Sequence, residues 1–490
     1  MDTMAFAEGP ARQATPSRPA ATTLGWRIQA GIALALLAAG LAPAVLNGLP
    51  MVFPDTEGYL VSAQMLRPQH VRAFGYGAFL RLTGGLWSLW LPVVAQALVA
   101  AWLVLRLLIL ETARLPLRWR HPAALALLAV VLLGHLPWLV AWVQPDLFTG
   151  LLVLAVYLLA AHWDALPRLE RGLLLLAALG AATTHLTHPP LLLGLALFAL
   201  AVLGIGAAAG VARRLAAVRR TVLLALALAV ASWGMLAGAN WITYRTPTAS
   251  LGAPVFLFSR LAADGDAAAA LRPGCESGSG WAICAHLDWL TLPADEFLWR
   301  EWSPLPALGY TSGFMREAAV LNPILLRHDW PVWLANSAAR TVQQMASVEL
   351  GDGMDSEGPT LLVEELGKSG LEALGASLMH TRQAADAMRL LMPATAAEAL
   401  AVMGLAALVG LAALGLYRRR PALWWPALFF LACWVGNAGL IALAGEVHGR
   451  YSARLVWLAP LLAGALVLRA VAPKARLGEE ASPRPPTFSG

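Results

Sequence analysis

The sequence predicts an all-α protein that crosses a membrane about ten times. Of its 490 residues, 59% are hydrophobic and only 13% are charged, whereas soluble globular proteins contain about 25% charged residues. Apolar stretches of roughly 20 residues, the length that a helix needs to cross a bilayer, recur along the chain. Arginines are concentrated in the short segments between these stretches, which is typical of cytoplasmic loops.

The elements follow in order from the N-terminus. Residues 1–27 are rich in Ala, Pro, Ser and Thr, which predicts a disordered cytoplasmic tail. The apolar stretch after it is long and lacks a small-residue cleavage site, so we expect a retained span rather than a cleaved signal peptide. The predicted spans cover residues 28–46, 86–109, 122–141, 147–162, 172–186, 190–210, 221–241, 395–416, 423–443 and 453–471.

The arginine-rich loops set the expected orientation. Arg114, Arg214 and Arg419 each lie in such a loop, and a cytoplasmic N-terminus places all three loops in the cytoplasm. The same orientation returns the tail 472–490 to the cytoplasm. The net charge of +6 therefore reflects topology and not nucleic-acid binding. Lysine is nearly absent, as in proteins encoded by GC-rich bacterial genomes, and we expect the bacterial inner membrane.

Two larger segments are then expected in the periplasm. The first is the loop 47–85, within a membrane core of residues 28–241. The second, 242–394, is long enough to form a mainly helical domain, inserted before the last spans in 395–471. Since Trp prefers the membrane–water interface, this domain should lie on the membrane. Its tryptophans include Trp281, Trp289, Trp299, Trp302, Trp330 and Trp333.

Local patterns in this insertion give three further expectations. Cys275 and Cys284 should form a disulfide in an oxidising compartment, with two free thiols as the alternative; two cysteines alone make zinc improbable. Amphipathic helices should be broken at Pro323 and Pro331. The acidic stretch 351–358 lacks the residue order of a calcium loop, which favours a solvated turn.

The strongest candidate for chemistry is the segment Pro54-Asp55-Thr56-Glu57-Gly58-Tyr59-Leu60, just after the first span. At the edge of the hydrocarbon a carboxylate can stay ionised. Such a carboxylate can accept a proton from a hydroxyl nucleophile. The alternative is that Asp55 only caps a short helix that begins at Thr56.

Three other positions of the same expected face carry polar groups. Asp146 follows Pro145 at the start of a span and is either a second acid or a helix N-cap. His185 and His188 flank the turn between two spans and could bind a phosphate, although a lone His is more often structural.

The third position is the segment from Glu446 to Tyr451. Arg450 could bind a phosphate bidentately, or it could be an interface anchor beside Tyr451. Glu446 and His448 are close enough in sequence to orient Arg450. Arg72 in the first loop is a weaker phosphate candidate.

These motifs resemble those of the GT-C superfamily of multi-span glycosyltransferases, such as protein O-mannosyltransferases and aminoarabinose transferases. The resemblance rests on Asp55 before Tyr59-Leu60, the segment Tyr76-Gly-Ala-Phe-Leu-Arg-Leu, Gln144-Pro145-Asp146, and Gly449-Arg450-Tyr451. It covers roughly the first 190 residues and one short late segment. Many members carry adjacent acids or Asp-x-Asp where this chain has Asp-Thr-Glu, so either Asp55 or Glu57 could be the base.

The resemblance implies inverting transfer of a sugar from a polyprenyl-phosphate donor to a hydroxyl of a glycan, lipid or protein on the periplasmic face. Asp55 would be the base, supported by Glu57 or Asp146. No cofactor is firmly implied, no metal ligands are apparent, and a divalent metal stays open because its use varies across the superfamily. The substrate-binding candidates are Tyr59, Arg72, His185, His188, Glu446, His448, Arg450 and Tyr451.

Three other functions are compatible with the sequence. A polymerase or ligase of lipid-linked polysaccharide would share the compartment and the lipid. A transporter or flippase should place ionisable groups near the bilayer midplane, whereas the candidates here cluster at one edge. A scaffold would tolerate the loss of Asp55.

Overall fold

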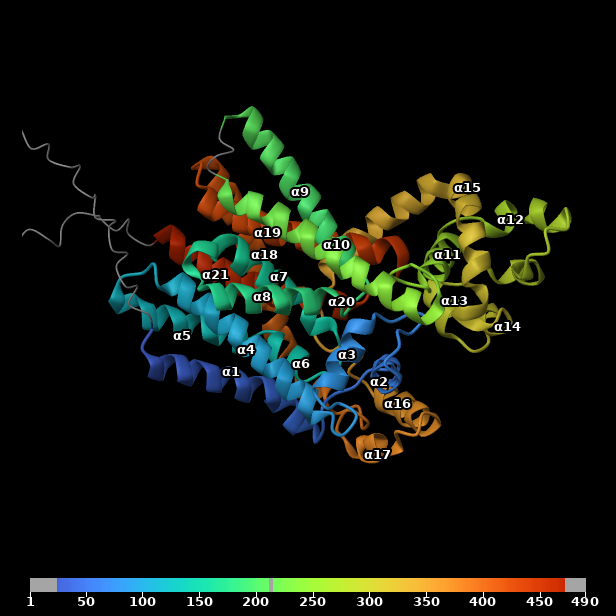
Figure 1. Cartoon of the computed structure of the whole chain (residues 1–490), viewed down its shortest axis with the longest axis horizontal. Helices are drawn as coiled ribbons and strands as arrows, with labels where there is room; N and C mark the ends of the chain where they lie inside the picture. Colours follow the sequence, from blue (N-terminus) through green and yellow to red (C-terminus); the bar gives the residue numbers. More distant parts are fainter. Residues whose placement is uncertain (1–23, 211–214, 472–490) are drawn as a thin grey trace, which may run out of the picture.

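The computed structural model describes residues 24–210 and 215–471, and this part of the chain folds into helices and connecting loops (Figure 1). Eight of the described helices are long and apolar enough to cross a membrane, so the chain is a multi-pass membrane protein. They are α1 (Trp26–Asn47), α4 (Trp90–Thr112), α7 (Asp146–His162) with the turn after it to Ala165, α9 (His188–Ala208), α10 (Ala216–Tyr244), α18 (Ala394–Tyr417), α19 (Pro421–Ala444), and α20 (Gly449–Val456) together with α21 (Leu458–Val471).

The described helices of spanning length are two fewer than the sequence predicted. Instead of the span 122–141 the chain forms α5 (Leu117–Leu133) and then the short α6 (Leu136–Val140). Gly134 ends α5 in an extended conformation, and Pro137 lies at the start of α6. The span 172–186 is replaced by α8 (Arg168–Ala182). At 1.5 Å per residue, α5 and α8 are roughly 22–26 Å long, shorter than the hydrocarbon thickness of about 30 Å.

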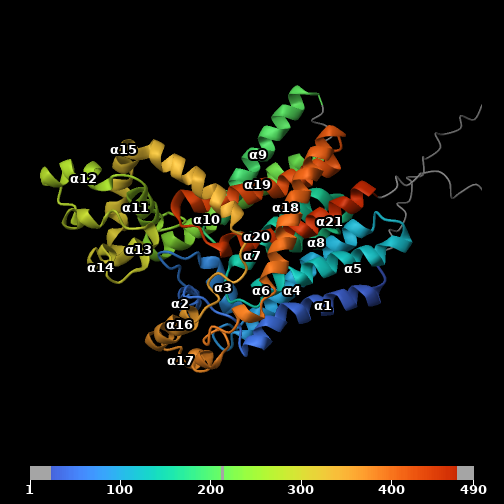
Figure 2. The same cartoon turned by 180° about the vertical axis from the view of Figure 1, so that it is seen from behind.

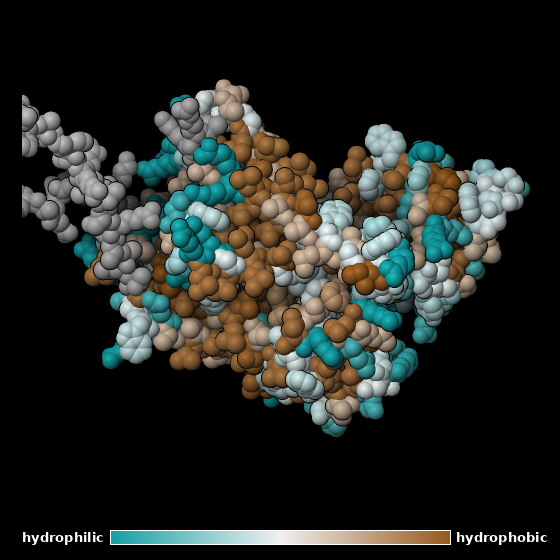
Figure 3. Space-filling model, in the orientation of Figure 1, coloured by the Kyte–Doolittle hydropathy of each residue, from teal (hydrophilic) through white to brown (hydrophobic). Residues whose placement is uncertain are grey.

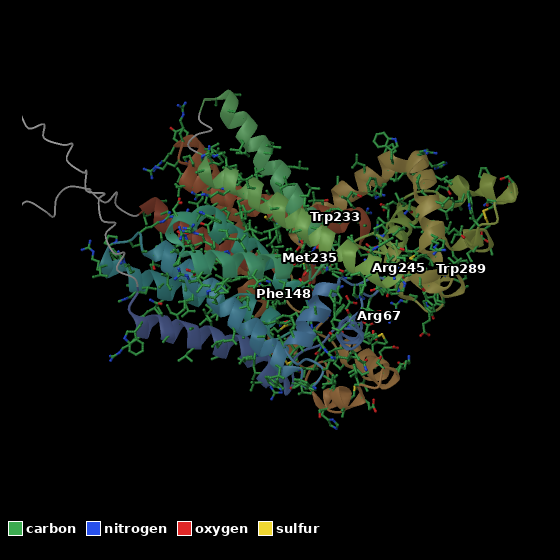
Figure 4. The ribbon with its side chains drawn as sticks, viewed as in Figure 1. Arg67, Phe148, Trp233, Met235, Arg245 and Trp289 are labelled. Carbon is green, nitrogen blue, oxygen red and sulfur yellow. A yellow bond between two sulfur atoms is a disulfide. The ribbon has the colours of Figure 1, made fainter. Side chains whose placement is uncertain are left out.

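Helix α7 is the centre of the bundle. In its most apolar stretch of 18 residues, 89% of the residues are buried. Helix α7 packs against α4, α8, α10 and α20. Gly150 permits the close approach of α20, because a Cβ at this position would lie 2.3 Å from the indole nitrogen of Trp457. By contrast α10 lies on the outside, where Trp233 and Met235 are exposed (Figure 4). The bundle surface seen in Figure 3 is largely hydrophobic, as lipid contact requires.

The first loop contains α2 (Thr56–Met65) and α3 (Phe74–Leu82) and is fastened to the segment before α7. Met51 donates a backbone hydrogen bond to Ala141 at 3.0 Å and accepts one from Val143 at 2.9 Å. The Thr56 hydroxyl donates to the Val143 carbonyl at 3.0 Å. These bonds bring the start of α2 next to the start of α7.

The insertion expected as one domain, 242–394, is divided between two hydrophobic cores. Residues from Val255 to Leu325 form a separate core, whereas Leu350, Leu362 and Met388 belong to the core of the bundle. In both views α16 and α17 lie beside α2, away from α11–α14 (Figures 1 and 2). The helices of the insertion are α11 (Ala253–Asp264), α12 (Ala267–Glu276), α13 (Ala294–Trp299), α14 (Pro304–Ala307), α15 (Tyr310–Ala346), α16 (Glu357–Lys368) and α17 (Glu372–Gly375).

Three expectations for the insertion have different outcomes. The disulfide between Cys275 and Cys284 is present, with the two Cα atoms 5.6 Å apart. The predicted break at Pro323 is wrong, because α15 continues through it and bends only at Asp329, where φ is −127°. Pro331, two residues later, disfavours helical geometry just before it.

The stretch 351–358 contains the predicted turn between α15 and α16, but it is only partly solvated. Gly351, Gly353 and Met354 are buried. The backbone of Gly353 packs so closely on Phe53 that a Cβ there would lie 2.4 Å from the ring. The acidic stretch is thereby fixed against the first loop, beside the candidate site.

Candidate functional site

The polar residues predicted to share one face come together where α1 ends and α7, α9 and α20 begin. Asp55 occupies the N-cap position of α2, but its side chain makes no capping hydrogen bond. Its carboxylate instead pairs with the Arg72 guanidinium, and its second oxygen lies 3.9 Å from a guanidinium nitrogen of Arg450. The interpretation of Asp55 as a mere helix cap therefore does not describe its contacts.

Arg450 is held rigidly between aromatic rings. Its guanidinium carbon lies 3.9 Å from the ring centroid of Phe53 and 4.6 Å from that of Tyr451. The guanidinium donates to the Tyr451 hydroxyl at 2.8 Å, and only 11% of the side chain is exposed. An interface anchor would extend into the headgroups, whereas this arginine is preorganised over a cation–π surface.

Arg454, the second residue of the predicted span 453–471, was not among the predicted site residues, and it is the completely buried cation of the site. It donates to the Asp146 carboxylate at 3.4 Å and to the Asn437 side-chain oxygen at 2.6 Å. The N-cap residue of α7 is Pro145, and Asp146 is the first residue of the helix, where its carboxylate pairs with this arginine. The overlooked signal was an arginine at the very start of a predicted span, four residues after Arg450 and hence on the same helix face.

The two histidines have different surroundings. His188 is fully buried, and its ring nitrogens lie 2.8 Å from the Thr149 hydroxyl and 2.8 Å from the Ala181 carbonyl. Both nitrogens are thus occupied in joining α9 to α7 and α8, which makes His188 structural. His185 lies closer to the site, with one ring nitrogen 3.4 Å from Arg454 and the other 2.8 Å from the Thr187 hydroxyl.

A cavity of about 330 Å³ opens beside Asp55, between the first loop and the insertion. Glu57 lines it, and burial, followed by the nearby Glu365 carboxylate, raises the pKa of Glu57. Tyr59 does not line it, because its ring is buried edge-on against Tyr76 at 5.1 Å. The polar and aromatic lining suits a sugar-sized polar ligand, and its other members include His70, Arg72, Trp299, Tyr310, Thr311 and Ser312.

Glu446 and His448 do not orient the Arg450 side chain as the sequence suggested. The Glu446 carboxylate pairs with Arg260 of α11. His448 lies 2.9 Å from an oxygen of Asp295 and 3.7 Å from one of Asp352. Asp352 also accepts a hydrogen bond from the Arg450 backbone nitrogen at 3.2 Å.

Asp295 and Asp352 are therefore neighbours of the site that sequence reasoning missed. Both lie in the insertion, roughly 100 residues or more before Arg450 in the chain, and no local pattern links them to it. Only the fold brings them together.

The ion pair between His448 and Asp295 should make stability depend on pH. The hydrogen bond to Asp295 raises the pKa of His448 above its ordinary value of 6.5, although burial and Arg450 oppose the shift and Asp352 supports it. A raised pKa in the folded state means that the stabilisation is complete below about pH 6.5 and is lost as the pH rises through the raised value. Because both side chains are partly exposed, solvent screening keeps the effect small.

We therefore expect Asp295→Asn to lower the melting temperature at acidic pH and to have little effect at alkaline pH. Thermal melts of the wild type and this variant across the pH range measure the difference. A difference that grows with pH would contradict the assigned pair.

A second buried polar cluster lies at the opposite end of the bundle, which corrects the expectation of a single polar face. The Glu111 carboxylate accepts hydrogen bonds from Arg469 at 2.6 Å and from Tyr157 at 3.1 Å, and lies 2.9 Å from His162. His162 ends α7, about 24 Å from Asp146 at 1.5 Å per residue. Since these groups satisfy one another, the cluster joins α4, α7 and α21 without an open position for a ligand.

Within residues 24–210 and 215–471, no group of three or more His, Cys, Asp or Glu side chains is arranged to hold a metal ion. No known protein family, curated protein or solved structure matches this chain. The arrangement of Asp55, Arg72, Arg450 and the adjoining cavity is therefore the basis for any assignment of function.

Proposed function

We propose that this protein is a membrane glycosyltransferase of GT-C type, which moves a sugar from a polyprenyl-phosphate donor to a hydroxyl acceptor. One observation carries the proposal: the Asp55 carboxylate borders a cavity of about 330 Å³ and contacts two guanidinium groups at the end of a membrane bundle. A carboxylate beside a polar cavity can serve as a base, and guanidinium groups match phosphate oxygens.

In the proposed step, the Asp55 carboxylate accepts the proton of the acceptor hydroxyl. The acceptor oxygen attacks the anomeric carbon, and the bond from that carbon to the phosphate oxygen breaks. The polyprenyl phosphate leaves with the electron pair, and the anomeric configuration is inverted. Arg72 and Arg450 would stabilise the charge that develops on the phosphate, since preorganised cations contribute most where new charge appears.

The roles of the remaining acids follow from their contacts. Asp146 is paired with the buried Arg454, so we assign it to positioning rather than to proton transfer. Glu57 lines the same cavity, and burial raises its pKa. We assign Glu57 to hydrogen bonding with the acceptor. Asp55, which contacts both Arg72 and Arg450, is assigned as the base.

The location of the site agrees with a lipid-linked donor. The candidate spans beginning at Asp146 and Gly449 both start at the cluster, so its cations lie near the depth of lipid phosphates. An isoprenoid tail can then stay between the hydrocarbon chains while its phosphate reaches the arginines.

We also propose that the site faces the periplasm, because the arginine-rich loops lie at the opposite end of the helices. A cysteine in place of the exposed Lys368 of α16 should react with an impermeant maleimide in intact cells. A cysteine in place of the exposed Arg418, just after α18, should react only after lysis. The reverse labelling pattern would contradict this orientation.

Replacing Arg450 by Lys tests the phosphate role directly. Lysine keeps the charge but loses the planar fork that can hold two phosphate oxygens. We expect about 10-fold weaker donor binding, equivalent to about 1.4 kcal/mol, with equilibrium binding of a labelled polyprenyl-phosphate sugar as the readout. Arg389→Lys, in an exposed ion pair with Asp355, is the matched control. Unchanged donor affinity in Arg450→Lys would remove Arg450 from the phosphate site.

A further inference from the structure

The second half of α15, residues 330–346, buries polar side chains and exposes mainly apolar ones. Ser337, Arg340 and Gln344 are spaced by three and four residues, and all three are buried. The opposite face is exposed and mostly apolar, with Gln343 as an exposed polar residue near its end. It includes Trp330, Val332, Leu334, Ala335, Ala338, Ala339 and Val342.

The buried polar stripe has well-defined partners. Arg340 donates two hydrogen bonds to the Asp264 carboxylate, at 2.5 and 2.6 Å, and a third to the Ala442 carbonyl at 3.1 Å. The Trp333 indole nitrogen donates to the Leu443 carbonyl at 3.2 Å. Because Ala442 and Leu443 belong to the last turn of α19, a candidate span, this helix lies at the level where α19 leaves the hydrocarbon.

The exposed face has the opposite character. Val342 is 67% exposed and Trp330 is 56% exposed. Arg340 is the only charged residue between Trp330 and Ala346, and it points inward. In Figure 1 this half of α15 slopes from the bend at Asp329 back towards the bundle, and Figure 3 shows hydrophobic surface along it. In water such a surface is unfavourable, whereas hydrocarbon requires it.

We propose that residues 330–346 are immersed in the outer part of the bilayer, with the apolar face of this helix covered by lipid acyl chains. The occupant is lipid because the depth is set by the end of α19 and because the outward face carries no charge. Trp330, at the start of the segment, has the amphipathic ring that favours the interface. This inference does not depend on the proposed reaction.

The lipid-covered helix is also tied directly to the segment that carries Arg450. The Gln344 side chain donates to the His448 carbonyl and to the Ser452 hydroxyl, both at 2.8 Å, and accepts from the His448 backbone nitrogen at 3.1 Å. The exposed face of this helix would thus contact lipid, while its buried face is hydrogen-bonded to the start of α20.

The test uses an environment-sensitive fluorophore, NBD, on single introduced cysteines in the full chain. Cys433 is buried, and Cys275 and Cys284 are bonded to each other, so Val342→Cys is the reactive thiol in the described chain. Val320→Cys is the matched control, because it is 58% exposed on the first half of the same helix. Both proteins are reconstituted into phosphatidylcholine vesicles and quenched with doxyl-labelled lipid or aqueous iodide.

We expect doxyl lipid to quench the label at position 342 at least threefold more strongly than the label at position 320, with iodide giving the reverse order. Strong iodide quenching at position 342, equal to that at position 320, would place the helix in water and overturn the proposal. Protection of position 342 from both quenchers would also overturn it. A stable dimer that Val342→Asp disrupts would then identify a second copy of the chain as the occupant.

Discussion

Replacing Asp55 by Asn is expected to reduce sugar transfer by about 10²–10⁴-fold, because the amide cannot accept a proton from the acceptor hydroxyl. Stability should change little. Asp55 makes no capping hydrogen bond, and asparagine keeps a side-chain oxygen that can accept from Arg72, so the loss should be about 1 kcal/mol. The measurements are kcat for transfer from a labelled polyprenyl-phosphate sugar and the melting temperature in the same detergent.

A matched control is available at the other end of the bundle. Asp164 pairs with Arg220 at 2.7 Å, and Asp164→Asn removes an ion pair of the same type far from the cavity. This control should keep full activity. If Asp55→Asn is as active as Asp164→Asn, then Asp55 is not the base. A variant that is inactive only because it is unfolded would show a lowered melting temperature, which separates the two explanations.

Replacing Arg454 by Met is expected to destabilise the protein by about 3–5 kcal/mol, because it leaves a buried carboxylate without its cation. Asp146 is 3% exposed, and its hydrogen-bond partner is Arg454. Arg454 also donates to Asn437 and Thr187, so the start of α20 would lose these two hydrogen bonds to α19 and to the start of α9. Chemical denaturation in detergent gives the change in the free energy of unfolding.

The double variant Asp146→Asn with Arg454→Met isolates the charge pair. Removing both charges should recover a large part of the lost stability, because the cost lies mainly in leaving one charge buried alone. Arg389→Met, at an exposed pair, should cost less than about 0.5 kcal/mol. Additive losses in the double variant would show that Arg454 and Asp146 do not interact.

Several features followed from the sequence because they depend on local composition. The strong apolar stretches near 90–112 and 394–417 form long helices, since backbone groups in hydrocarbon must be paired within the segment. Cys275 and Cys284 are only nine positions apart in the sequence, so a short loop suffices to bring them together. The gathering of Asp55, Asp146 and Arg450 at one end requires helices that alternate in direction, with the shorter α5 and α8 returning the chain between α4, α7 and α9.

Other features could be decided only by tertiary contacts. Hydropathy does not show that Gly134 ends α5 early, or that Asp352 bonds to the backbone of Arg450 from a distant segment. Nor does it distinguish His188, whose ring nitrogens are both occupied, from His185 beside Arg454. Each of these contacts depends on which donor or acceptor from a distant segment lies next to the side chain in the folded protein.

By itself, then, the sequence determined that the chain is a helical membrane protein with a polar edge, because lipid solvation acts on each segment separately. The tertiary structure decided which ions pair. Arg454 could take its place inside the bundle only because Asp146, Asn437 and Thr187 converge on it from three other helical segments. A buried charge is stable only when its partners are already in position, and that condition belongs to the packed bundle and not to any one span.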